Sequence, residues 1–99
     1  MDYKILHKPA VETDIAAALD YYSKMNLKLS RQFMFRFEEA IINITRLPLG
    51  FQIKYKEVRT LLLKQFPYHI HYLIDDNKQR IIILAIIHAY KNPNDYSQR

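Results

Sequence analysis

The sequence predicts a two-layer α+β fold, in which a helical hairpin packs on a mainly antiparallel four-stranded sheet in the order β-α-α-β-β-β. Residues 10–47 carry apolar side chains at helical intervals. From residue 56 onward, three apolar stretches alternate with turn-like segments, a pattern typical of consecutive strands. The 99 residues, 49% of them hydrophobic, suffice for one core but not for two. We therefore expect residues 1–99 to form a single domain.

The first strand and the first helix are predicted to meet at Pro9. Residues 2–8 alternate in the manner of a strand, which Pro9 ends. From residue 10 to about residue 25 the apolar spacing becomes helical. Glu12 and Asp14 fall in the first turn of this helix, where the helix dipole favours negative charge.

A second, longer helix is predicted after a break at Asn26. It begins within residues 27–30 and cannot continue past Pro48. The two helices are expected to form an antiparallel hairpin. Residues 49–54, which include the only glycine of the chain, are expected to be a connecting loop.

Three strands are predicted in the second half of the chain, at residues 56–65, 68–75 and 80–88. The turn-like segments between them, residues 66–67 and 76–79, are short. Short connections favour an antiparallel meander. The last strand is apolar on both faces, as expected of a central strand that helices cover on at least one side.

Composition excludes several classes of function. The chain has no cysteine, which removes disulfides, thiolate metal sites and cysteine nucleophiles. Gly-rich phosphate loops, serine nucleophile elbows and paired-carboxylate motifs are not visible, which argues against nucleotide hydrolysis and acyl transfer. The longest apolar run, residues 81–87, is far short of the roughly 20 residues of a bilayer span. We therefore expect a soluble, cytoplasmic protein without a cofactor or a membrane partner.

The net charge of +5 comes entirely from the second part of the chain. Acidic and basic side chains cancel in residues 1–40, so the basic excess lies in residues 41–99. A one-sided basic surface suits a polyanion such as RNA, or an acidic protein partner. Ordinary charge for solubility is an equally good explanation.

Polar residues follow the end of the last predicted strand, at and after His88. An imidazole titrates near neutral pH and can take up or donate a proton. Tyr90, Lys91 and Tyr96 follow His88 within one short segment, which makes this place a candidate for a small catalytic site. The alternative is a strand-end histidine satisfied by backbone groups.

Arg59 is a second candidate. A guanidinium can hold a phosphate with two hydrogen bonds and stabilise charge in a phosphoryl-transfer transition state. The alternative is a structural ion pair, for example with Glu57.

His69 and His71 point two imidazoles to one face of a strand, a spacing that zinc sites use. Zinc would need a third and usually a fourth ligand, so no metal site is predicted. We expect instead two polar residues on a partly exposed sheet face.

Motifs along almost the whole chain resemble the RelE/ParE superfamily of bacterial toxins, also described as plasmid stabilisation proteins. These motifs are Asp14-Ile15, Ala18, Tyr21-Tyr22, Leu29, Phe33, Ile41, Pro48, Val58-Arg59, Phe66-Pro67-Tyr68-His69-Ile70-His71-Tyr72, and Ala85-Ile86-Ile87-His88 with Pro93. The resemblance implies the toxin of a type II toxin–antitoxin module, with the fold derived above and a cognate antitoxin that wraps over its surface.

The superfamily has two branches, and each implies a different function. Toxins similar to RelE cleave mRNA on the ribosome without a metal, using the ribose 2′-hydroxyl as nucleophile. On this first reading the catalytic residues are His88, Tyr96 and Arg59, and the RNA-binding residues are Lys54, Lys56, His69, Tyr90, Lys91 and Arg99. Toxins similar to ParE inhibit DNA gyrase without being enzymes, which is the alternative, together with an inactive homologue.

The sequence departs from the nuclease pattern at three of these positions. RelE-type nucleases often have arginine where His69 stands, and related members have arginine at the position of Tyr90 and tryptophan at that of Tyr96. The loss of two arginines reduces the capacity to hold phosphate, so both branches stay open.

Overall fold

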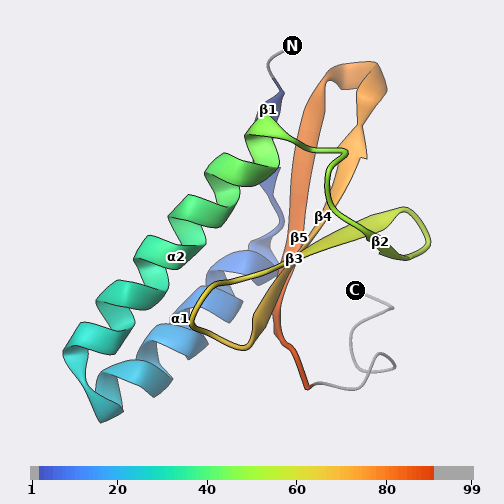
Figure 1. Ribbon diagram of the computed structural model, residues 1–99. Helices are drawn as coiled ribbons and strands as arrows, with labels where there is room; N and C mark the ends of the chain where they lie inside the picture. Colours follow the sequence, from blue (N-terminus) through green and yellow to red (C-terminus); the bar gives the residue numbers. More distant parts are fainter. Residues whose placement is uncertain (1–2, 91–99) are drawn as a thin grey trace.

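The computed structural model describes residues 3–90 and contains two helices packed on one sheet (Figure 1). The elements of this part of the chain are β1 (Lys4–His7), α1 (Pro9–Met25), α2 (Leu27–Arg46), β2 (Ile53–Tyr55), β3 (Val58–Leu62), β4 (Tyr68–Asp75), the 3-10 turn η1 (Asp76–Lys78) and β5 (Arg80–His88). The α+β class, the helical hairpin and the two-layer arrangement are therefore as predicted.

Within the described residues the sheet has five strands rather than four, in the order β1-β5-β4-β3-β2. β1 runs parallel to β5, and the other neighbours are antiparallel. The additional strand, β2, begins in the segment that was expected to be a loop. It forms because Lys56, with φ of 50°, occupies the left-handed region and turns the chain back, so that Tyr55 pairs with Val58. β3 consequently begins at Val58, two residues later than predicted.

Asn26 makes the break between the helices. Its backbone is extended, its N–H donates to the carbonyl of Tyr22 at the end of α1, and its side-chain oxygen accepts from the N–H of Lys28 at 2.8 Å. One residue thus caps both helices. At the other end of α1, Pro9 is the first helical residue, where its missing N–H costs nothing.

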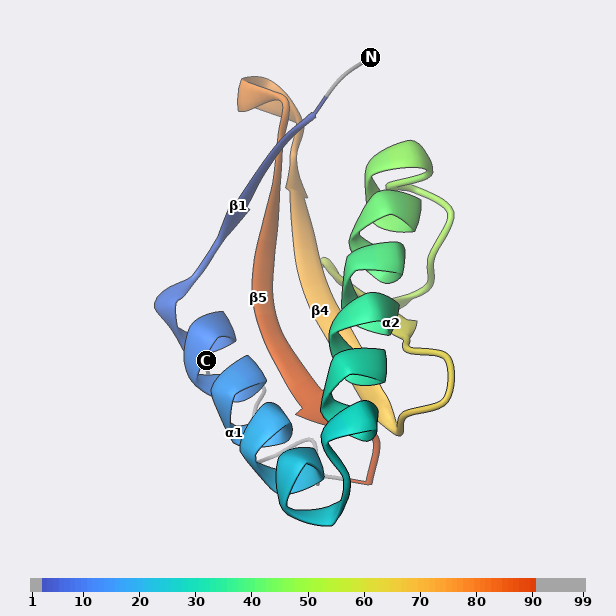
Figure 2. The ribbon, with the colours of Figure 1, turned by 90° about the vertical axis from the view of Figure 1, so that its left-hand side faces the viewer.

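Both helices cover the same face of the sheet: they lie to its left in Figure 1, and Figure 2 looks from the helix side with the strands behind. The largest fully buried side chains lie between these two layers: Tyr72, Phe33, Ile44, Ile70, Ile81 and Ile83. Tyr68, Ile70, Tyr72 and Ile74 all belong to this core, so the predicted alternation of β4 is confirmed. Within residues 3–90 no helix is long and apolar enough to cross a membrane.

A bulge in β5 changes the face to which its side chains point. Tyr72 pairs with Ile83 and His71 with Ala85, which leaves Leu84 without a partner across β4. Before the bulge Ile81 and Ile83 face the helices; after it Ile86 does, while Ala85 and Ile87 pack on the opposite face. The bulge therefore brings His88 onto the helix side of the sheet.

Candidate functional site

His88 lies at the exposed end of β5, opposite Tyr68 in the register. Its ring makes an edge contact with Tyr68 at 5.2 Å and a tilted contact with Tyr90 at 5.3 Å between centroids. Its Nδ1 accepts from the backbone N–H of Tyr90 at 3.3 Å. His88 therefore has a backbone donor, and within residues 3–90 its other ring nitrogen makes no further hydrogen bond.

A groove of about 330 Å³ separates the end of β5 from α1. Its lining residues are Asp14, Ala17, Ala18 and Tyr21 of α1, Tyr68 of β4, and Ile86, Ile87 and His88 of β5. Asp14 Oδ2 accepts from the backbone N–H of Ile86 at 2.9 Å. Asp14 was expected to complement the helix dipole, but the acidic residue of the first turn is Glu12 alone, and Asp14 instead satisfies the edge of β5.

Arg59 lies in β3, two strands away from β5 in the sheet. Its Nη1 donates to the carbonyl oxygens of Phe51 at 2.6 Å and Leu49 at 3.3 Å, so it orders the segment between α2 and β2. Arg59 pairs with Tyr72, at the level of Ile83, five residues before His88 in β5. Along β4, however, Tyr72 stands only four residues from Tyr68, the partner of His88, because the bulge takes up one residue of β5. Four residues span about 13 Å along a strand, so the structure does not bring Arg59 and His88 together.

His69 lies close enough to Lys54 for the charge of the lysine to affect the pKa of the imidazole. Burial lowers the pKa of His69, and the positive charge of Lys54 lowers it further. Both were predicted to bind RNA, together with Lys56, which occupies the turn between β2 and β3. A neutral His69 beside one lysine is a weaker phosphate site than an arginine in the same place.

His71 is buried, which corrects the prediction that His69 and His71 share a partly exposed face. His71 is only 2% exposed, and its Nδ1 lies 3.1 Å from the hydroxyl of Tyr55. Sequence reasoning missed this pair because Tyr55 fell between the loop expected at residues 49–54 and the strand expected from residue 56. Its partner strand became recognisable only with the hairpin at Lys56.

Of the remaining candidates, only Tyr90 lies within the described residues. Tyr90 is 86% exposed, and its ring contacts that of His88. Lys91, Tyr96 and Arg99 lie outside the described residues. Among residues 3–90, no group of three or more His, Asp or Glu side chains could hold a metal ion.

Comparison with known proteins identifies the class to which this fold and its surfaces belong. Residues 5–93 match the family described as the ParE toxin of the type II toxin–antitoxin system parDE. A search of curated proteins gives no match.

Solved structures show the same fold. A chain of the chromosomal ParDE system from P. aeruginosa aligns with a TM-score of 0.75 at 18% identity, over 87% of this chain and 95% of that one. The E. coli RelBE complex gives 0.58 at 12% identity, over 90% and 99%. The RelBE2 complex from Mycobacterium tuberculosis gives 0.57 at 17% identity, over 89% and 99%.

The fold is thus that of the small RelE/ParE toxins. The family match covers most of the chain, and the protein belongs to the ParE toxin family of type II toxin–antitoxin systems.

Proposed function

We propose that the chain inhibits growth by binding DNA gyrase without cutting RNA, and that a cognate antitoxin neutralises it. The observation that carries this proposal is the separation of Arg59 from His88. Phosphoryl transfer requires cations and proton donors within contact of one phosphate. Here Nη1 of Arg59 donates to the carbonyls of Leu49 and Phe51, and Arg59 lies in β3, two strands away from the end of β5 that carries His88.

Two further observations support a binding toxin. The matching family is the ParE family, and the ParDE chain from P. aeruginosa superposes with a higher TM-score than the two RelBE chains compared above. The partner in the ParDE and RelBE structures is an antitoxin, and the excess positive charge of this chain suits an acidic protein.

The outer face of α2 is the surface we assign to gyrase. Phe35 is 62% exposed and Ile42 is 53% exposed. They stand seven positions apart, so both lie on the same side of the helix. A shallow groove of about 370 Å³ runs between them, bordered by Glu38, Glu39, Asn43 and Arg46. Large apolar side chains that share an exposed face mark interaction surfaces.

Ribosome-dependent mRNA cleavage is the second candidate, because His88 is exposed and contacts Tyr68 and Tyr90 at the end of β5. On this alternative His88 moves a proton, and Tyr96 and Lys91 complete the site. The residue that the nuclease needs most is then His88, whereas the gyrase inhibitor does not need it.

One experiment tests both candidates. The toxin is expressed under control, cellular mRNA is analysed by primer extension, and purified toxin is added to a gyrase supercoiling assay. We expect loss of supercoiling and no cleavage ends, and we expect the variant His88→Ala to inhibit as well as the wild type. Cleavage ends that disappear in His88→Ala, with normal supercoiling, would establish the nuclease instead.

A matched pair of variants tests the α2 face. Ile42→Glu places a charge on that face, and Leu62→Glu places one on β3 at nearly equal exposure, since Leu62 is 52% exposed. We expect Ile42→Glu to weaken gyrase inhibition at least tenfold and Leu62→Glu to leave it unchanged. Equal effects of both variants would show that α2 is not the contact surface.

A further inference from the structure

We infer that a small apolar pocket between the two helices binds an uncharged single-ring molecule that carries a hydroxyl group, of which phenol is the simplest. The pocket has a volume of about 210 Å³ and lies between β1, β5 and both helices. It shares no lining residue with the groove at the end of β5 or with the outer face of α2. The proposed function does not depend on this pocket, so each can fail without the other.

The divergence of the two helices creates the pocket. α1 and α2 meet at Asn26 and separate toward their other ends, where Figure 2 shows the strands behind them. The pocket lies in this wider part, since its lining residues come from the first two turns of α1 and the second half of α2. Ile5 of β1 and Ile83 of β5 contribute from the sheet. Helices that are close at the hairpin end thus leave space between them at the open end.

The interior of the pocket is lined by hydrocarbon side chains alone. They come from all four elements: Ile5, Val11, Ile15, Phe37, Ile41 and Ile83. A charged group would lose its hydration there without gaining a partner, so the interior excludes ions. It accepts an apolar ring, whose transfer from water is favourable.

The volume of the pocket limits its occupant to a small molecule. Apolar cavities of about 150 Å³ remain dry and bind benzene. A pocket of about 210 Å³ therefore has room for one ring with a substituent. An α-helix with its side chains is about 10 Å wide, which is more than a pocket of this volume admits. The size thus favours a single ring over a segment of a protein.

Two polar residues at the mouth determine which substituent the ring carries. His7 and Glu12 are the exposed lining residues, whereas Val11 and Ile83 are buried at 2% and 1% exposure and form the bottom. His7 Nε2 and Glu12 Oε1 lie 3.5 Å apart. A carboxylate only accepts hydrogen bonds, so Glu12 receives a hydroxyl donor and repels an anionic group. A neutral ring with one hydroxyl satisfies both the interior and the mouth.

NMR of the isoleucine methyl groups in the full-length protein tests the inference, with phenol as the probe. We expect phenol to shift the methyl signals of Ile5, Ile15, Ile41 and Ile83 until they saturate, with a Kd of about 1 mM or lower. Benzoate, a ring of similar size with a negative charge, should leave these signals unchanged. Glu12→Ala should weaken the binding of phenol about fivefold, the usual effect of one hydrogen bond, and should leave the binding of toluene unchanged.

A matched pair of variants locates the site. Ile15 and Leu19 are partly buried residues of α1 that pack against the core, but only Ile15 lines the pocket. We expect Ile15→Phe, which fills the pocket, to raise the Kd of phenol at least tenfold, and Leu19→Phe to change it less than twofold. Circular dichroism establishes that both variants fold. Should Ile15→Phe not fold, Ile41→Phe fills the pocket from α2.

Three results would overturn the inference. The first is the absence of saturable shifts in the wild type at ten times the expected Kd. The second is an equal loss of affinity in the pocket-filling variant and in Leu19→Phe. The third is binding of benzoate as tight as that of phenol. If the four methyl signals respond to the antitoxin and not to phenol, the pocket belongs to a protein interface and the inference fails, while the proposed function stands.

Discussion

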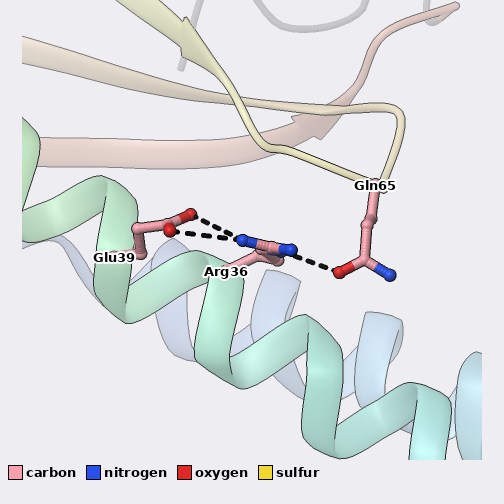
Figure 3. Close-up of polar contacts among 3 residues, drawn as sticks. All are labelled: Arg36, Glu39 and Gln65. Carbon is pink, nitrogen blue, oxygen red and sulfur yellow. Dashed lines mark hydrogen bonds and ion pairs between the residues drawn. The ribbon is translucent and has the colours of Figure 1, made fainter.

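Arg36 in the middle of α2 donates from Nε to Oε1 of Gln65 at 2.7 Å and so ties the helix to the connection between β3 and β4 (Figure 3). Its Nη1 donates to both carboxylate oxygens of Glu39 at 3.2 Å, which holds the guanidinium in place. Gln65 has φ of 71°, a conformation uncommon for a residue other than glycine. The next residue, Phe66, is buried in the core. The contact therefore fixes the turn that delivers Phe66 to the helices.

A double-mutant cycle with Arg36→Ala and Gln65→Ala should give a coupling free energy of about 1 kcal/mol, the usual net value for a hydrogen bond in a protein, because solvent weakens the charge of this exposed pair. Alanine leaves the strain at residue 65 in place, so the cycle isolates the contact. Urea unfolding of the four proteins measures it. Purely additive effects would show that the two side chains do not stabilise each other.

Tyr72→Phe should lower the free energy of unfolding by about 1–3 kcal/mol. The hydroxyl of Tyr72, a fully buried residue, donates to the carbonyl of Pro48 at 2.6 Å, and phenylalanine leaves that carbonyl without its donor. Tyr3→Phe is the control, because its hydroxyl bonds Asp76 at the surface. We expect that variant to change the unfolding free energy by about 0.5 kcal/mol or less. Equal losses for both variants would contradict the buried role of Tyr72.

Tyr72 also predicts how stability depends on alkaline pH. Burial raises its pKa from 10.0 to about 12, against a smaller opposite effect of Arg59. The folded state therefore keeps the proton that the unfolded state loses above pH 10. Stability should fall as the pH rises from 10 toward 12. The same titration of Tyr72→Phe should show a shallower fall, and an identical slope would rule out this tyrosine as its source.

The sequence predicted the elements whose signals are local, and it missed the contacts that depend on distant pairing. Helical spacing, Asn26 and Pro48 place both helices because caps and breakers act within a few residues. The sequence did not predict β2, because the turn after it has Lys56 in the left-handed region. A glycine or asparagine at that place would have indicated a hairpin. The contact of Asp14 with Ile86 joins residues 72 positions apart and follows from the bulge at Leu84, which no local pattern records.

The candidate site also has one part that the sequence could predict and one that it could not. That β5 ends in an exposed histidine was predictable from an apolar run that stops at a polar residue. The position of Arg59 depends on the register of three strands and on a loop whose carbonyls it holds, so the sequence alone left its role open.

Arg80→Met should raise the pKa of the Asp75 carboxyl. Arg80 Nη2 donates to Asp75 Oδ2 at 2.8 Å, and this hydrogen bond is the main reason that the pKa lies below 3.8. The carboxylate contributes stability above that pH, and the contribution is lost as the pH falls through the folded pKa. Carbon-detected NMR titration of Asp75 measures the change. Lys78→Met is the control and should move the pKa less, because the charge of Lys78 is the smallest of the causes.

Lys54→Met should raise the pKa of His69, but only in part. Burial is the larger cause of the low pKa and persists in the variant, whereas the repulsion from Lys54 disappears. Because the folded pKa lies below 6.5, the folded state favours neutral His69, and its stability declines as the pH falls below that value. A proton NMR titration of the ring follows the change. A pKa that does not move in Lys54→Met would remove Lys54 as a cause.

Arg59→Met should reduce stability without reducing toxicity per folded molecule. The guanidinium holds the carbonyls of Leu49 and Phe51, and its removal should cost about 1–2 kcal/mol of unfolding free energy. Lys64→Met removes the same charge from an exposed position and should cost little. Urea unfolding and gyrase supercoiling, with toxin concentration corrected for the folded fraction, separate the two effects. A fully stable Arg59→Met protein that no longer arrests growth would assign Arg59 to the active surface and would favour the nuclease over the gyrase inhibitor.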